Sequence, residues 1–223
     1  MIVTFSGLDG VGKTTQINLL LNDFSQRGLK VCSICDISAD FRYSNETQLL
    51  QLRKHFIYAD VVHTRFRMNS DINNGIMQYL EHGPIPNPKL AQRAATQGYL
   101  DFEQWHNTVM CDVVGRAKVI LYDRCHYDEI AFKTLYGCDF DDMVSMYRLF
   151  PKADLSIYLS ASPRVLINRN SHREDGKITL YRNVNHISQL NSIFDRVVAI
   201  MNITEINGEQ SIQSIHRQIM QLM

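Results

Sequence analysis

Eight residues near the N-terminal end combine glycines, a lysine and a hydroxyl group at a spacing that suits phosphate chemistry. Residues 7–14 read GLDGVGKT, that is Gly, four free positions, Gly, Lys and Thr, which is the pattern of a phosphate-binding loop. Polyphosphate needs several converging backbone N–H groups, and a Cβ at the tight positions would block its approach. Lys13 can reach the β- and γ-phosphates, and Thr14 can hold Mg²⁺. The predicted nucleotide-binding residues are Gly7, Asp9, Gly10, Val11, Gly12, Lys13, Thr14 and Thr15.

A second group of polar residues follows a buried strand far along the chain. The apolar run at 118–122 is followed by Asp123 and Arg124. An acidic residue at this place can hold Mg²⁺ opposite Thr14, and an arginine beside it would bring a cationic fork to the same phosphates. The alternative is a helix cap or a surface ion pair. The phosphate-binding loop favours the first interpretation, with Thr14 and Asp123 as metal ligands.

Two arginines four residues apart form the third group. Pro163 begins a predicted helix that carries Arg169, and Arg173 follows on the same face. Phosphoryl transfer places negative charge on three equatorial oxygens, and arginines that close over them are a common solution. A solvated basic helix is the alternative. We expect a helical lid whose arginines act in the transfer.

A hydroxyl acceptor would also need a carboxylate as general base, whereas a phosphate acceptor is already ionised. The sequence leaves this choice open. The candidate bases are Asp9, Asp36, Asp40 and Asp128.

Strands alternate with helices along the whole chain. The strand candidates are 2–5, 30–35, 118–122, 154–160 and about 199–206, and the main helical segments are 15–24, 46–82, 89–114 and 209–222. Short apolar strands alternating with helices predict an α/β fold of the P-loop NTPase type, with three α/β/α layers and a five-stranded parallel sheet. Ligands of such sheets bind at the carboxyl ends of the strands, which is where the phosphate-binding loop must lie.

The 223 residues suit a single domain over 1–223, with a helical insertion around 46–90 as an open alternative. Positive and negative charges balance, so we expect no nucleic-acid partner. No apolar run is long enough to span a membrane, and no secretory signal is recognised. Cys32 and Cys35 lie in a strand-like run, where reduced cysteines are more plausible than a redox pair. These features predict a cytoplasmic protein.

The motifs together resemble the thymidylate kinase family. Residues 5–16 look like the opening of that family, apart from Ser6 where Glu is usual, and 154–163 look like the strand that precedes its lid. Asp123-Arg124 is similar to the family's Asp-Arg pair, which serves metal and acceptor phosphate. The resemblance covers about 1–30 and 115–215. It implies ATP as donor, Mg²⁺ and a nucleotide or nucleoside acceptor, with a homodimer left open.

The resemblance also assigns roles to single residues. Asp9 matches the family's acidic residue that contacts the acceptor sugar, and Arg169 and Arg173 fall where lid arginines lie. Gly10, which is Arg in some members, is similar to members whose lid supplies that group. The predicted catalytic residues are therefore Lys13, Arg124, Arg169, Arg173 and Asp9.

Departures from the family lie on the acceptor side. The family has an Arg-Glu-Pro loop after its second strand, where this chain has residues 36–42 with Arg42. The family's Phe-Ala-x-x-Arg-like helix is replaced by YLDFE at 99–103, and Cys125 and Asp128 replace Tyr and Ser after the Asp-Arg pair. The donor side is intact, so the sequence predicts a phosphotransferase whose acceptor is a nucleoside monophosphate or a nucleoside.

Three other functions stay open at this point. A nucleotide-hydrolysing switch would carry the same loop, but the chain lacks the guanine-reading Asn-Lys-x-Asp. A nucleotide-binding protein with a lost acceptor site would not need Lys13, Thr14, Asp123 and Arg124 together. A kinase of a non-nucleotide small molecule is the third alternative.

Overall fold

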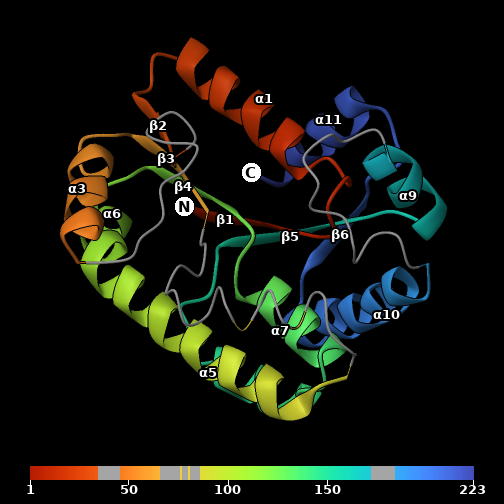
Figure 1. Cartoon of the computed structure of the whole chain (residues 1–223). Coiled ribbons are helices and arrows are strands. Elements are labelled where there is room, and N and C mark those ends of the chain that lie inside the picture. Colours follow the sequence, from red (N-terminus) through yellow and green to blue (C-terminus); the bar gives the residue numbers. More distant parts are fainter. Residues whose placement is uncertain (35–45, 66–75, 77–79, 81–85, 172–183) are drawn as a thin grey trace.

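A computed structural model of the chain describes residues 1–34, 46–65, 76, 80, 86–171 and 184–223. In this part of the chain six parallel strands form one sheet in the order β2-β3-β4-β1-β5-β6. Figure 1 shows α1 and α11 on one side of the sheet and α5, α7 and α10 on the other. The strands are β1 Ile2–Ser6, β2 Val31–Ser33, β3 Val61–Thr64, β4 Val119–Asp123, β5 Leu155–Ser160 and β6 Thr204–Asn207.

The helices occupy the connections between the strands. They are α1 Lys13–Gln26, α3 Glu46–Phe56, α5 Pro88–Trp105, the π-helical segment η1 His106–Met110, α6 Cys111–Val114, α7 His126–Leu135, α8 Phe140–Tyr147, α9 Pro163–Ser171, α10 Val184–Met201 and α11 Ile212–Leu222. The predicted three-layer α/β fold with a parallel sheet is therefore confirmed.

The predicted number of five strands is wrong, because β3 lies inside the segment 46–82 that was expected to be helical. All four residues of β3 are buried between β2 and β4. A strand of four residues gives almost no periodic signal, and α3 just before it favoured a helical interpretation. The last strand also begins later than predicted, since α10 ends at Met201 and Asn202 adopts a φ of 53°.

The strand β4 shows how the core is built on both faces of the sheet. Leu121 packs in a large apolar cluster with Phe5 of β1 and Ile130 of α7. Ile120 and Tyr122 point the other way, into a second cluster with Trp105 at the end of α5. Burial on both faces holds β4 rigidly and fixes the place where Asp123 and Arg124 leave the sheet.

Candidate active site

The loop between β1 and α1 has a backbone that requires glycine. Gly7, Gly10 and Gly12 have φ values of 131°, 90° and 104°, which L-amino acids with a Cβ rarely adopt. A Cβ on Gly7 would also lie 2.4 Å from the carbonyl oxygen of Leu159 in β5. The chain can therefore turn tightly against β5 and begin α1 at Lys13 with its free N–H groups facing outward.

A cavity of about 620 Å³ opens at the carboxyl ends of β1, β3 and β4. It brings together most of the residues that the sequence singled out. Of the predicted nucleotide-binding residues, Gly7 and Val11 do not line it. Arg173, a predicted catalytic residue, falls outside the described residues. The cavity is lined by Asp9, Gly10, Gly12, Lys13, Thr14, Thr15, Arg65, Asp123, Arg124 and Arg169.

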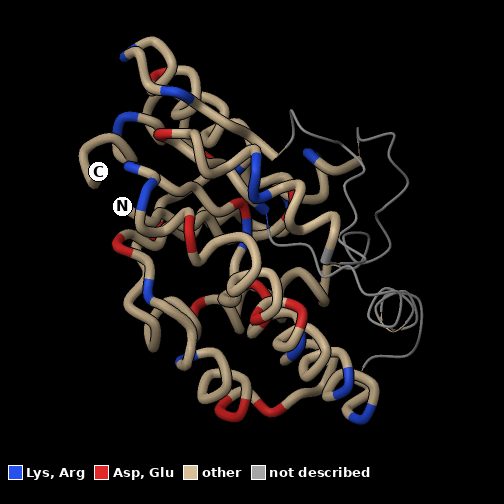
Figure 2. Tube along the Cα trace, turned by 90° about the vertical axis from the view of Figure 1, so that its left-hand side faces the viewer, with Lys and Arg blue, Asp and Glu red and all other residues tan. Residues whose placement is uncertain are grey.

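Among the described residues, four cationic side chains and two carboxylates line this cavity. The described part of the site therefore carries an excess of positive charge, although the whole chain has a formal net charge of zero. Figure 2 shows basic and acidic residues interspersed along the rest of the described trace. A local excess of positive charge inside a cleft attracts an anion such as a polyphosphate without making the protein basic.

Lys13 lies folded against its own loop. Its Nζ donates hydrogen bonds to the carbonyl oxygens of Gly7 at 2.7 Å and Leu8 at 3.1 Å, and the side chain is buried. Burial and the neighbouring Arg124 lower the pKa of Lys13 to about 8, although Asp123 and other carboxylates oppose this shift. The ammonium group is thus held at the floor of the loop, beside the cavity that it lines.

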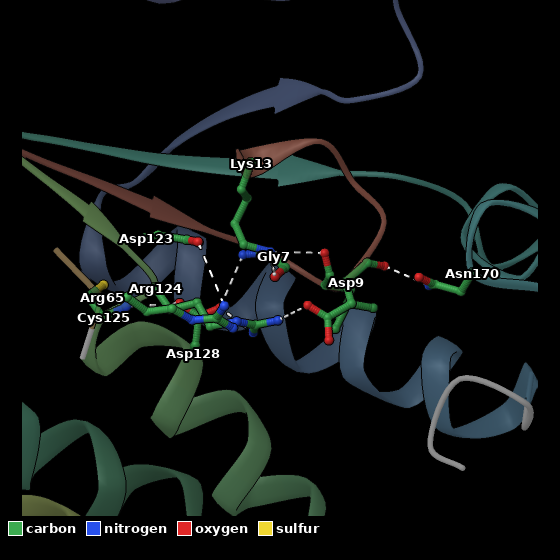
Figure 3. Close-up of polar contacts among 10 residues, drawn as sticks. Gly7, Asp9, Lys13, Arg65, Asp123, Arg124, Cys125, Asp128 and Asn170 are labelled. Atoms are coloured by element: carbon green, nitrogen blue, oxygen red, sulfur yellow. Dashed lines mark hydrogen bonds and ion pairs between the residues drawn. The ribbon is translucent and has the colours of Figure 1, made fainter. Parts of the chain in front are cut away.

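Arg124 leaves β4 in a left-handed conformation, with a φ of 71°. Its guanidinium forms an ion pair with Asp9 and a second contact, at 3.3 Å, with Asp128 (Figure 3). Burial by itself raises the pKa of Asp9, but attraction to Arg124 and Lys13 outweighs it and keeps the pKa well below its usual range. Asp9 is therefore a carboxylate held in its charged form.

Asp123 lies at the end of β4 with its side chain 6% exposed. Its Oδ2 is 4.0 Å from a guanidinium nitrogen of Arg65, while its buried Oδ1 has no hydrogen-bond partner among the described residues. Thr14 lines the same cavity. One unsatisfied carboxylate oxygen and one hydroxyl fit Mg²⁺, which binds few protein oxygens and completes its shell with water and phosphate.

The described residues hold no group of three His, Cys, Asp or Glu side chains that would form a metal site from the protein alone.

The end of α9 touches the phosphate-binding loop. Arg169 donates to the carbonyl oxygens of Gly10 at 3.2 Å and Gly208 at 3.1 Å. Asn170, which is fully buried, donates to the carbonyl oxygen of Asp9 at 2.8 Å. The sequence identified Arg169 but missed Asn170, because an asparagine inside a helix carries no signal of a partner 161 residues away.

Arg65 is the other residue that the sequence missed. The resemblance suggests an acceptor loop after the predicted strand at 30–35, at residues 36–42 with Arg42, which lie outside the described residues. In the structure the strand beside β4 is β3, and Arg65 follows it directly into the cavity. The β-branched run VVHT before Arg65 was the available signal for a buried strand.

Of the two candidate bases among the described residues, Asp9 lines the cavity and Asp128 does not. Asp128 is buried and contacts Arg124, and Asp36 and Asp40 are not among the described residues.

No helix of the described part is long and apolar enough to cross a membrane.

Comparison with known proteins identifies relatives of this chain. The family model described as thymidylate kinase matches residues 46–219. A thymidylate kinase of Desulfotalea psychrophila is 22% identical over 223 residues, which include 98% of this chain and 91% of the relative. A probable thymidylate kinase of Pyrococcus horikoshii is 23% identical over 99% of this chain and 94% of its own length. A thymidylate kinase from Schizosaccharomyces pombe is 24% identical over 100% of this chain and 90% of its own length. The chain therefore belongs to the thymidylate kinase family and is a nucleotide kinase, for which this family implies ATP as the phosphoryl donor.

Proposed function

We propose that this chain transfers the γ-phosphoryl group of ATP to the phosphate of a nucleoside monophosphate. One observation carries the choice of acceptor: the two carboxylates among the described residues that line the cavity are both engaged by arginines, Asp9 by Arg124 and Asp123 by Arg65. The depressed pKa of Asp9 makes this carboxylate a poor general base for a hydroxyl. A phosphate oxygen is already ionised and needs no base.

The cavity also offers cations for two phosphate-bearing substrates. The loop amides and Lys13 suit the donor phosphates, after Lys13 leaves its contacts with Gly7 and Leu8. Arg65 and Arg124, which follow β3 and β4 into the cavity, suit the acceptor phosphate. Asp9, which is paired with Arg124, would contact the acceptor sugar.

Thr14 and Asp123 would hold Mg²⁺ at the donor phosphates. Such an ion neutralises charge on the β- and γ-phosphate oxygens. Arg169 lies at the rim of the same cavity and would face the transferred group once it releases its backbone contacts. Arg173, four residues on, is proposed to complete this lid, and replacing it with Ala should lower kcat more than it weakens ATP binding.

The decisive experiment is an acceptor panel. The protein is mixed with ATP and Mg²⁺, and ADP release is followed with nucleoside monophosphates, the matching nucleosides and several phosphorylated metabolites. The names of the relatives make thymidine monophosphate the first acceptor to test. We expect release that depends on a monophosphate and is absent with its nucleoside. Lys13→Ala should abolish it, while Lys152→Ala, an exposed lysine, should not.

Other results point to other functions. Turnover with a nucleoside alone would contradict the choice of a phosphate acceptor, and turnover with a metabolite alone would favour a non-nucleotide kinase. ATP binding without any turnover would favour a binding protein with a lost acceptor site. A cytoplasmic location, the absence of nucleic-acid and membrane partners, and a homodimer remain predictions. The cytoplasmic location is supported by four cysteines among the described residues that form no disulfide.

A further inference from the structure

A buried carboxylate beneath the cavity serves three donors. The side chain of Asp128 is 3% exposed. Its Oδ1 accepts a hydrogen bond from the Gly7 backbone N–H at 3.2 Å and from Arg124 Nη1 at 3.3 Å, and its Oδ2 accepts one from the Cys125 N–H at 3.2 Å. A charge buried this deeply is stable only when it is well paired. The pairing of Asp128 ties α7 to both the loop and the arginine.

Local structure explains why a carboxylate is tolerated at this place. Asp128 occupies the third position of α7, where it forms a capping box with Cys125. The N-terminal end of a helix favours a negative charge and has unsatisfied N–H groups to offer. A capping role alone would use only Oδ2, however. The contacts of Oδ1 with Gly7 and Arg124 go beyond what α7 needs.

The conformation of Arg124 is held by contacts with other residues. Its φ of 71° is uncommon for a residue with a side chain, and its backbone N–H donates to the carbonyl oxygen of Phe5 at 2.9 Å. The guanidinium lies 5.7 Å from the centre of the Phe132 ring. Asp128 fixes one nitrogen of that guanidinium, so that the other nitrogen reaches Asp9 (Figure 3).

These contacts join two points of the phosphate-binding loop to the same arginine. Gly7 bonds to Asp128, Asp128 pairs with Arg124, and Arg124 pairs with Asp9 of the same loop. The loop that suits the donor phosphates is thereby linked by hydrogen bonds and ion pairs to the arginine that suits the acceptor. A hydroxyl at position 128 has one oxygen, which would not span the separate donors that the two carboxylate oxygens reach.

We propose that Asp128 is a positioning residue for phosphoryl transfer, which holds the Arg124 guanidinium at a fixed place relative to the phosphate-binding loop. This inference rests on the function proposed above. Asp128 does not line the cavity, so we expect no direct contact between this carboxylate and the substrates. It acts through Arg124, and a misplacement of that group by about 1 Å can lower a rate about 100-fold.

The test compares two isosteric substitutions at the same helical position. Asp128→Asn keeps the shape but removes the charge, and Asp142→Asn does the same at the third position of α8, where the side chain is exposed. We expect Asp128→Asn to lower kcat by about 10- to 100-fold with the KM for ATP changed less than threefold. Asp142→Asn should leave both constants unchanged.

A double-mutant cycle shows whether Asp128 acts through Arg124. In an Arg124→Ala background, Asp128→Asn should lower kcat much less than it does in the native chain. Equal effects in both backgrounds would overturn the proposal, as would a kcat within twofold of the native value. So would equal losses of kcat and of ATP affinity, which indicate a structural role. If Asp128→Asn does not fold, Asp128→Ser is measured by the same criteria.

A readout without turnover separates this inference from the proposed function. Amide hydrogen exchange of peptides covering residues 1–12 should quicken about tenfold or more at Gly7 in Asp128→Asn, because its amide loses a charged acceptor. Asp142→Asn should not change it. Unchanged exchange would overturn the inference even in an active enzyme. Faster exchange in a protein that phosphorylates no monophosphate would confirm that Asp128 holds the loop at Gly7 and would refute the proposed function.

Discussion

Lys13 is an ammonium group that burial makes expensive to keep charged. Desolvation and the nearby Arg124 lower its pKa to about 8, with partial compensation by Asp123 and Asp9. A bound polyphosphate would add negative charge beside Nζ and raise that pKa again. The protonation of Lys13 and the binding of ATP are therefore linked, and each should favour the other.

We predict that ATP affinity is constant below pH 8 and falls above it by up to about tenfold per pH unit. Above pH 8 the free protein holds Lys13 neutral, so binding must take up a proton. Titration calorimetry in two buffers of different ionisation enthalpy measures that uptake directly. Lys13→Arg is the control, because a guanidinium stays charged throughout this range. Proton uptake that persists in Lys13→Arg would assign the effect to another group.

The helix α9 carries its functional contacts in its last turn. Arg169 and Asn170 bond to the backbone of the phosphate-binding loop at Gly10 and Asp9. A Cβ on Gly10 would lie 3.0 Å from the Asn170 side chain. The helix α9 and the loop are therefore packed together at this point, and both the φ of 90° and the nearness of Asn170 favour glycine at position 10.

We predict that Asn170→Ala lowers the free energy of unfolding by about 1–2 kcal/mol, because the carbonyl of Asp9 loses its donor and Gly10 loses its packing partner. Urea denaturation provides the measurement. Asn168→Ala is the matched control, since Asn168 is exposed on the same helix and should change stability by less than about 0.5 kcal/mol. Equal effects of the two substitutions would show that the contact with the loop contributes nothing.

The sequence predicted those elements whose signal lies in a contiguous stretch of residues. The strand β1, the glycine loop and α1 were found because their motif is contiguous, and Asp123-Arg124 because it follows a clear apolar strand. The strand β3 was missed because four residues carry little periodicity, and Arg65 was missed with it. The hydrogen bonds that join Asn170 to Asp9 and Asp128 to Gly7 link residues more than 100 positions apart, which no local pattern encodes.

The six strands of the described chain form one continuous sheet, and β3 supplies part of it from within the segment 46–90. Elements from both halves of the chain also meet at the cavity, through Arg65 after β3 and Arg169 in α9. Such interdependence is typical of a domain that unfolds in a single step. The cooperativity of unfolding therefore tests the prediction that residues 1–223 form one domain.

We predict a single calorimetric unfolding transition, with equal calorimetric and van't Hoff enthalpies. ATP with Mg²⁺ at about 100 times its Kd should stabilise the whole chain by about 2.7 kcal/mol, which raises Tm by roughly 5–10 °C for a chain of this size. Lys13→Ala, which removes the ammonium from the loop, should show the same single transition with little shift. Two transitions, of which ATP moves only one, would instead mean that part of the chain, such as 46–90, unfolds separately from the sheet that holds the site.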